Sequence, residues 1–305
     1  MAFDARRDLT GIVASLHTPF DAQGKVDTAS LLRLVDHVAG AGCTGVLATA
    51  VAGEVGSLEP EERRQLLRAL GRATRNRLAL VAGVSAPDLG TSTALAREAV
   101  LAGADMILWQ PPAGLSAEAL EDGLQQLAKA GPGPIMLQDL DWQGPGIDVG
   151  VIKRLAERVP ELQAVKIETV PAGPKYSAVR AACGDRLHLS GGWAAMQMLD
   201  GLARGLDAFV PSGVLPAYVR VFRLWADGKR DAARALFERM LPILAFSNQH
   251  IGVSIAFWKG VRKAERIFST DLCRPPIAPL DAVQKAEAAL LAARAEALDL
   301  ELRRT

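Results

Sequence analysis

Lys166 is the residue of this sequence whose type and surroundings point most directly to chemistry. It lies in the stretch LQAVKIETV, residues 162–170, whose other members are mainly apolar. Burying an ammonium group costs free energy, so a buried lysine has a partner, a path to water or a chemical task. A desolvated amine has a lowered pKa and can attack a carbonyl to form a Schiff base, an electron sink for making or breaking carbon–carbon bonds. The structural alternatives are an ion pair with Glu168 or an outward position beneath a helix.

Glu168 is the first candidate for moving protons around such a lysine. Alternation along a strand puts Glu168 on the same side as Lys166 and Ala164. A carboxyl group in that place could protonate and deprotonate a carbinolamine formed on the neighbouring amine. Pairing with Lys166, or capping of the following loop, is the alternative for this side chain.

Three further ionisable residues lie near the ends of apolar runs. His17 directly precedes Thr18-Pro19 and could act as a base near neutral pH, although packing or a turn hydrogen bond is an alternative. Asp139 and Asp141 lie near the end of the predicted strand 135–140, and we rank both below Glu168 as candidates for proton transfer.

Tryptophans also gather at such ends, at positions 109, 142 and 193. If they share one mouth, the pocket is apolar and larger than one built for small dicarboxylates. The alternative is that they close loops against the core.

Short apolar runs alternate with helical patterns along most of the chain, which predicts parallel strands joined by helical crossovers. The predicted strands are 11–17, 45–50, 78–84, 106–110, 135–140, 162–168, 187–192 and 207–212. Their near-continuous apolar character is typical of a sheet covered on both sides.

The number of units favours a (β/α)₈ barrel, an α/β fold also called a TIM barrel, over an open doubly wound sheet. An open sheet would more naturally carry G-x-G-x-x-G after its first strand, where this chain reads HTPFDAQGK. We expect the barrel to span residues 1–228 and a C-terminal helical extension, residues 229–305, to pack on it or on a neighbouring subunit. In such a barrel, function lies at the carboxyl ends of the strands, which includes Lys166.

The composition narrows the function classes. The 305 residues carry a formal net charge of +1 without a basic block, which argues against nucleic-acid binding. No apolar run approaches the length of a membrane span, and the N-terminus does not resemble a secretory signal. Cys43, Cys183 and Cys273 fit neither a disulfide framework nor a zinc pattern. We therefore expect a cytoplasmic protein with no metal and no cofactor.

Four collinear segments resemble the dihydrodipicolinate synthase/N-acetylneuraminate lyase family. They are TPFDAQGKVD, GCTGVLATAVAGEVGSLEPEERRQLL, VAGVSAPDLGTSTALAREAVLAGADMILWQPP and LQAVKIE. The resemblance implies a (β/α)₈ barrel with a C-terminal helical extension, usually assembled as a tetramer, with a dimer as the alternative. It also implies that Lys166 is the Schiff-base former and acts on pyruvate or another 2-keto acid.

The same resemblance implies a carboxylate-binding turn at residues 51–54, where the family reads G-T-T-G-E. The two threonines fall on Val51 and Ala52, whereas Gly53 and Glu54 are retained. Backbone N–H groups of this turn could still hold the keto-acid carboxylate, because that interaction needs no side chain.

Other family positions also differ. The tyrosine of the fifth strand falls on Gln138, and an amide cannot be a general acid or base. The tyrosine of P-P-Y-Y is replaced by Ala113 and Gly114, and an arginine of many synthases corresponds roughly to Gln143. We expect Gln138 to line the substrate site, together with three residues from the seventh and eighth strands: Gly191, Gly192 and Val210.

Two functions follow as hypotheses. The first is a Schiff-base lyase or aldolase, or a related hydro-lyase, acting on a 2-keto acid such as pyruvate and an unidentified aldehyde. The alternative is a catalytically degenerate homologue that binds a keto acid or has a regulatory role. It is suggested because the threonines and tyrosines that the resemblance implies as a proton relay are replaced at Val51, Ala52, Gln138 and Ala113.

Overall fold

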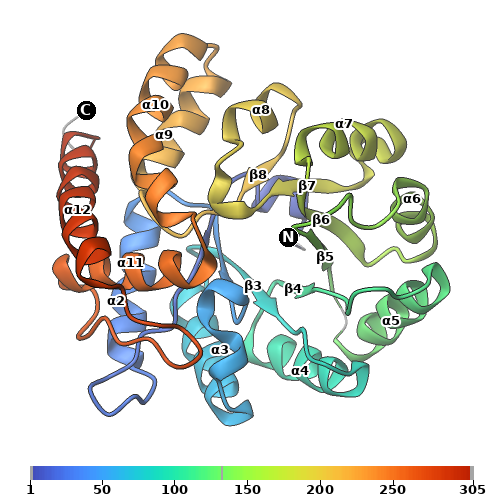
Figure 1. Cartoon of the computed structure of the whole chain (residues 1–305). Coiled ribbons are helices and arrows are strands. Elements are labelled where there is room, and N and C mark those ends of the chain that lie inside the picture. Colours follow the sequence, from blue (N-terminus) through green and yellow to red (C-terminus); the bar gives the residue numbers. More distant parts are fainter. Residues whose placement is uncertain (1–2, 132, 303–305) are drawn as a thin grey trace.

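A computed structural model describes residues 3–131 and 133–302 of the chain. Eight parallel strands pair in sequence order, and β8 returns to β1, which closes the barrel (Figure 1). The strands are β1 Gly11–Ser15, β2 Gly45–Ala48, β3 Ala79–Gly83, β4 Met106–Trp109, β5 Ile135–Asp141, β6 Leu162–Thr169, β7 His188–Gly191 and β8 Ala208–Phe209. Each lies within its predicted range or extends it by one residue, so the predicted (β/α)₈ barrel is confirmed.

Helices surround the barrel and cover the outer face of the sheet (Figure 1). They are α2 Thr28–Gly40, α3 Pro60–Thr74, α4 Leu89–Ala102, α5 Ala117–Ala130, α6 Val149–Arg158, α7 Ala172–Cys183, α8 Met198–Ala203 and α9 Leu215–Ala226. Local sequence sets several of their starts: Asp27, Asp88, Ser116 and Asp148 each accept a hydrogen bond from a backbone N–H of the first turn.

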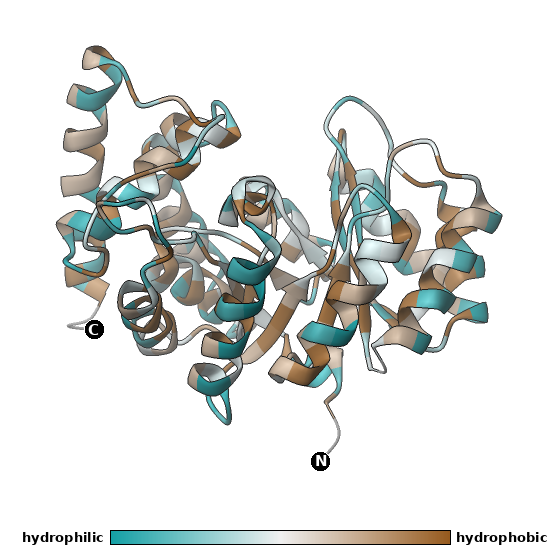
Figure 2. Cartoon of the chain, turned by 90° about the horizontal axis from the view of Figure 1, so that it is seen from below, coloured by the Kyte–Doolittle hydropathy of each residue, from teal (hydrophilic) through white to brown (hydrophobic). Residues whose placement is uncertain are grey.

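Two hydrophobic layers result from strands that are buried on both faces. The larger lies between the strands and the helices, and the smaller fills the barrel interior with residues such as Val13, Leu47, Val81 and Met136. A short N-terminal helix, α1 Ala5–Asp8, packs Ala5 against the interior layer. Figure 2 shows the hydrophobic colours along the strands and mixed colours along the surrounding helices.

Three helices follow the eighth unit, as predicted: α10 Arg230–Ser247, α11 Ile251–Ala264 and α12 Ala282–Leu302. α10 packs on α9, and α12 packs on both. α10 and α11 meet at a bend of 115°, and α11 contacts the turn that follows β2. The extension therefore reaches the carboxyl-terminal end of the barrel, where the site is expected.

No single helix within residues 3–131 and 133–302 is long and apolar enough to cross a membrane; α10 and α11 reach the necessary length and composition only as a bent pair.

Candidate active site

A cavity of about 160 Å³ opens at the carboxyl ends of the strands, with Lys166 in its wall. Strand register explains its make-up: Gln138 of β5 lies opposite Lys166 of β6, and Leu140 lies opposite Glu168, so these side chains share the inward face. The remaining lining residues are Ser15, Leu47, Ala50, Val51, Ala52, Trp142, Trp193, Val210, Ser212, Asn248, Gln249, His250, Ile251 and Ser254.

Lys166 and Glu168 form a buried ion pair at the bottom of this cavity. Lys166 is 6% exposed, and its Nζ lies 2.5 Å from Glu168 Oε2. Gln138 Nε2 donates to the same oxygen at 2.5 Å, and the Trp193 backbone N–H donates to Oε1 at 2.8 Å. The carboxylate is thus held from three sides, and the lysine remains beside open space.

Glu168 is ionised in this arrangement. Burial by itself would raise the pKa of Glu168, but the charge and hydrogen bond of Lys166 lower it, assisted by the donors from Trp193 and Gln138. The net effect keeps the pKa of Glu168 below its ordinary value. The resting site therefore holds Glu168 as a carboxylate beside the Lys166 side chain.

Gly192 is required next to this carboxylate for a steric reason. A Cβ at residue 192 would lie 2.0 Å from Glu168 Oε1, which no side chain allows. Gly191 instead faces outward, where a Cβ would meet the Tyr176 hydroxyl at 3.1 Å. Gly192 therefore makes room for Glu168, and neither glycine is among the residues that line the cavity. Their predicted contact with substrate stays a prediction.

The turn after β2 is a 3₁₀ helix, η1 Val51–Gly53, with Val51 and Ala52 facing the cavity. The N–H groups of Gly53 and Glu54 are used inside the turn, donating to Ala50 O at 2.9 Å and Val51 O at 3.1 Å. The N–H groups of Val51 and Ala52 precede them at the N-terminal end of η1, so these two are the candidates for binding a carboxylate.

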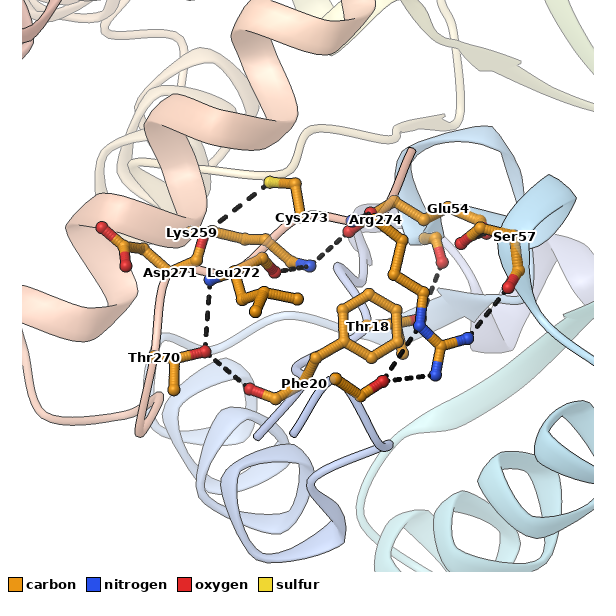
Figure 3. A network of polar contacts seen from close by, with 12 residues as sticks. Thr18, Phe20, Glu54, Ser57, Lys259, Thr270, Asp271, Leu272, Cys273 and Arg274 are labelled. Carbon is orange, nitrogen blue, oxygen red and sulfur yellow. Dashed lines mark hydrogen bonds and ion pairs between the residues drawn. The ribbon is translucent and has the colours of Figure 1, made fainter. Parts of the chain in front are cut away.

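Glu54 does not share the cavity with Val51 and Ala52. Its side chain turns to the far side of η1, where it pairs with Lys259 of α11 and accepts from the Arg274 backbone N–H (Figure 3). Direct binding of substrate by the Glu54 side chain would need that network to open. From the sequence we group Glu54 with Val51 and Ala52, because residue spacing does not show that the backbone turns at Glu54 and directs its side chain away from the cavity.

Two of the three predicted tryptophans share the cavity mouth. Trp142 and Trp193 stack edge to face, with ring centroids 4.7 Å apart. Trp109 lies elsewhere, because its ring packs against α5, where a Cβ on Gly123 would meet it at 2.7 Å. Val210 is also among the residues that line the cavity, and its predicted contact with substrate stays a prediction.

The polar far wall of the cavity was missed by the sequence interpretation. It consists of Ser15 from β1, Ser212 after β8, Ser254 of α11, and three residues from the bend between α10 and α11: Asn248, Gln249 and His250. The buried side-chain nitrogen of Asn248 has no hydrogen-bond partner within the described part of the chain. Strand parity could have found Ser15, two residues after inward-facing Val13, but nothing in the sequence predicted the approach of the extension.

The other ionisable candidates lie outside the cavity. His17 is buried, and burial, with the charges of Lys259 and Arg262, lowers its pKa to about 3. Asp139 faces outward and pairs with Lys175 at 3.1 Å, whereas Asp141 accepts from the backbone N–H groups of Gln143 and Gly146. These aspartates therefore shape the loop after β5.

The substitutions at the remaining family positions lie on exposed loops. Ala113 and Gly114 follow β4, and Gln143 follows β5. None of them is among the residues that line the cavity. Within the described residues, no group of three or more His, Cys, Asp or Glu side chains could hold a metal ion.

Comparison with known proteins identifies the class to which this barrel belongs. Residues 8–294 match the dihydrodipicolinate synthetase family, and the chain belongs to that family. A 4-hydroxy-tetrahydrodipicolinate synthase from Xanthomonas axonopodis pv. citri is 30% identical, with 95% of this chain and 96% of that protein covered. An L-2-keto-3-deoxyarabonate dehydratase from Azospirillum brasilense is 26% identical over 95% and 96% of the two chains.

Solved structures agree with this assignment. The crystal structure of dihydrodipicolinate synthase from Rhodopseudomonas palustris superposes with a TM-score of 0.88 at 26% identity, covering 96% of this chain and 99% of that one. N-acetylneuraminate lyase from Proteus mirabilis shares the fold, with a TM-score of 0.85 at 22% identity, over 94% and 99% of the two chains.

Proposed function

We propose that the chain is a Schiff-base lyase or dehydratase that acts on a 2-keto acid with an uncharged, hydroxylated chain. The observation that carries the proposal is a buried lysine beside both a carboxylate and open space, since Lys166 and Glu168 line the same cavity. Family membership supports an enzyme of the lyase kind.

Glu168 supplies the proton transfers that a tyrosine is expected to perform in the family. Lys166 gives a proton to Glu168 Oε2, and the neutral amine attacks the keto carbon. Glu168 returns the proton to the carbinolamine hydroxyl, which leaves as water. In sum, one ammonium and one ketone give one protonated Schiff base and one water, and Glu168 ends as the carboxylate. Gln138 orients that carboxylate but exchanges no proton.

The second half-reaction uses the same carboxylate. With the iminium as electron sink, Glu168 removes a proton from C3 to give an enamine. The enamine then expels a hydroxyl group from C4, which takes the proton from Glu168 and leaves as water. In the aldolase version, no C3 proton is removed: Glu168 takes the proton of the C4 hydroxyl, the C3–C4 bond breaks to release an aldehyde and leave the enamine on Lys166, and the proton is then returned to C3. Either version needs the N–H groups of Val51 and Ala52 for the substrate carboxylate.

The far wall supports an uncharged chain on the substrate. Among the described residues lining the cavity, only Lys166 and Glu168 are formally charged at neutral pH with histidine neutral. Within the described residues, the far wall has no lysine or arginine that could pair with a second carboxylate. Amides, hydroxyls and His250 suit hydroxyl groups, and the rings of Trp142 and Trp193 suit the carbon chain. The named dehydratase among the relatives, whose substrate name is a keto-deoxy sugar acid, fits this chemistry.

Two accompanying predictions concern the state of the protein. We propose a homo-oligomer, a tetramer or a dimer, in the cytoplasm, in line with the resemblance of the sequence to its family. Light scattering on the purified chain tests the first, with a mass near that of the 32.3 kDa chain as the contradicting result.

Exchange of the pyruvate methyl protons with D₂O tests the proposal without knowledge of the second substrate. An enamine on Lys166 must release and regain C3 protons, so proton NMR should show the methyl signal disappearing with wild type and not with Lys166→Met. Pyruvate binding without exchange would contradict the enzyme and favour the ligand-binding alternative. Faster turnover of 2-keto-3-deoxy sugar acids than of pyruvate together with aldehydes that carry a carboxylate would establish the substrate class.

A further inference from the structure

A second buried lysine–glutamate pair lies behind the η1 turn, outside the cavity. Lys259 is fully buried on α11 and pairs with Glu54 Oε1, and its Nζ also donates to Leu272 O at 2.8 Å (Figure 3). The Arg274 backbone N–H donates to Glu54 Oε2 at 2.8 Å. Both carboxylate oxygens of Glu54 are therefore held by the C-terminal extension.

The backbone of Glu54 makes this contact sensitive to position. Glu54 has φ +56°, in the left-handed region that residues with a Cβ rarely adopt, and its N–H closes the turn on Val51 O. Gly53 is fixed as well, since Thr18 Oγ1 donates to Gly53 O at 2.7 Å. The conformation of η1 is thus imposed by neighbours, and Glu54 is the side chain through which the extension imposes it.

Arg274 extends the same network to the barrel. Its guanidinium forms two hydrogen bonds with Glu62, at 2.6 and 2.7 Å, and donates to Ser57 O at 2.9 Å. The Phe20 ring contacts both cations, with Lys259 Nζ 4.2 Å and Arg274 Cζ 4.1 Å from its centroid. These contacts tie the segment after α11 to the loop between β1 and α2, to η2 Val55–Ser57 and to the first turn of α3.

A buried ion pair is weak as a source of stability, because desolvation offsets its attraction, and in some proteins such a pair serves instead to specify one conformation. α11 connects the cavity with the Lys259–Glu54 pair: Ser254 lines the cavity, and Lys259 lies five residues further along the same helix. We infer that Lys259 is a positioning residue, which acts through Glu54 to aim the Val51 and Ala52 N–H groups at the carboxylate of the keto acid. This inference rests on the proposed function.

The experiment measures pyruvate affinity from the concentration dependence of methyl exchange and of borohydride trapping. For Lys259→Met we expect the half-saturating concentration to rise about tenfold or more, since small displacements of binding groups are costly. The maximal exchange rate should change far less, because Lys166 and Glu168 are untouched. Lys263→Met is the matched control: Lys263 lies on the exposed side of α11, where it pairs with Asp271 of the segment after the helix. This variant should bind pyruvate as wild type does.

A double variant, Glu54→Gln with Lys259→Met, separates positioning from charge burial. It leaves no unpaired charge, so it should fold even if Lys259→Met does not. Raised half-saturation in the double variant supports positioning. Wild-type half-saturation in the folded double variant overturns the inference and leaves Lys259 a structural residue. Failure of the wild type itself to exchange or trap pyruvate would instead overturn the proposed function.

Discussion

The molecule contains two buried lysine–glutamate pairs within one end of the barrel, and they differ in what surrounds them. Lys166 and Glu168, the front pair, border a cavity, and the carboxylate is held by Gln138 and Trp193. Lys259 and Glu54, the rear pair, are enclosed by backbone groups and an aromatic ring, and neither side chain lines the cavity. A buried charge alone therefore does not indicate chemistry; space beside the amine and a carboxylate that can exchange protons do.

Removing the ammonium from the front pair should have the largest effect. Lys166→Met or Lys166→Ala is expected to lower turnover by about 10⁴-fold or more, as loss of a covalent nucleophile does. Methyl exchange and steady-state assays measure it. Retained activity with any substrate would remove the Schiff-base mechanism.

Removing the proton carrier comes next. Glu168→Gln keeps the size of the side chain and is expected to lower kcat by about 10²–10⁴-fold, the usual contribution of general acid–base catalysis. The matched variant of the rear pair, Glu54→Gln, should raise KM and leave kcat nearly as it is. Equal losses of kcat in both variants would erase the distinction between the two pairs.

Crowding the front carboxylate gives a steric version of the same test. A methyl group on residue 192 collides with Glu168, so Gly192→Ala is expected to lower kcat about 100-fold by displacing it. Gly191→Ala serves as control, since its nearest contacts lie at 3.1–3.2 Å and away from Glu168. A fully active Gly192→Ala variant would show that the position of Glu168 is unimportant.

Lowering the pH should reduce the folding stability through His17, which lies near Lys259 of the rear pair, and this is the smallest of the expected effects. His17 stays neutral in the folded chain, where burial and the charges of Lys259 and Arg262 lower its pKa to about 3. The unfolded chain binds a proton near its ordinary pKa of about 6.5, so folding stability falls as the pH drops below that value. By about pH 5 the loss from His17 is about 2 kcal/mol.

Chemical denaturation between pH 5 and 7 measures this effect. His17→Gln should flatten the pH dependence, whatever it does to stability at pH 7. Buried His188, with a pKa lowered to about 4, contributes in the same direction and remains in the variant. An unchanged slope in His17→Gln would contradict the lowered pKa of His17.

The sequence predicted the barrel well because apolar runs and helical spacing report burial directly. It also predicted that Lys166 and Glu168 share a face, since strand parity fixes that relation. It could not assign Glu54 to the rear network, because the partner residue, Lys259, lies 205 positions away. The polar wall from residues 248–254 was not predicted for a similar reason. The bend between α10 and α11 brings it to the cavity, and the angle between two helices cannot be read from the hydrophobic periodicity within each of them.

Reductive trapping tests the central claim most directly. The wild-type chain is incubated with pyruvate, reduced with borohydride, digested and analysed by mass spectrometry. The account predicts one reduced pyruvate adduct, on Lys166, and none on Lys259 or Lys175, the other buried lysines. Folded protein that yields no adduct with pyruvate or with 2-keto-3-deoxy sugar acids would contradict it and leave the front pair a structural ion pair.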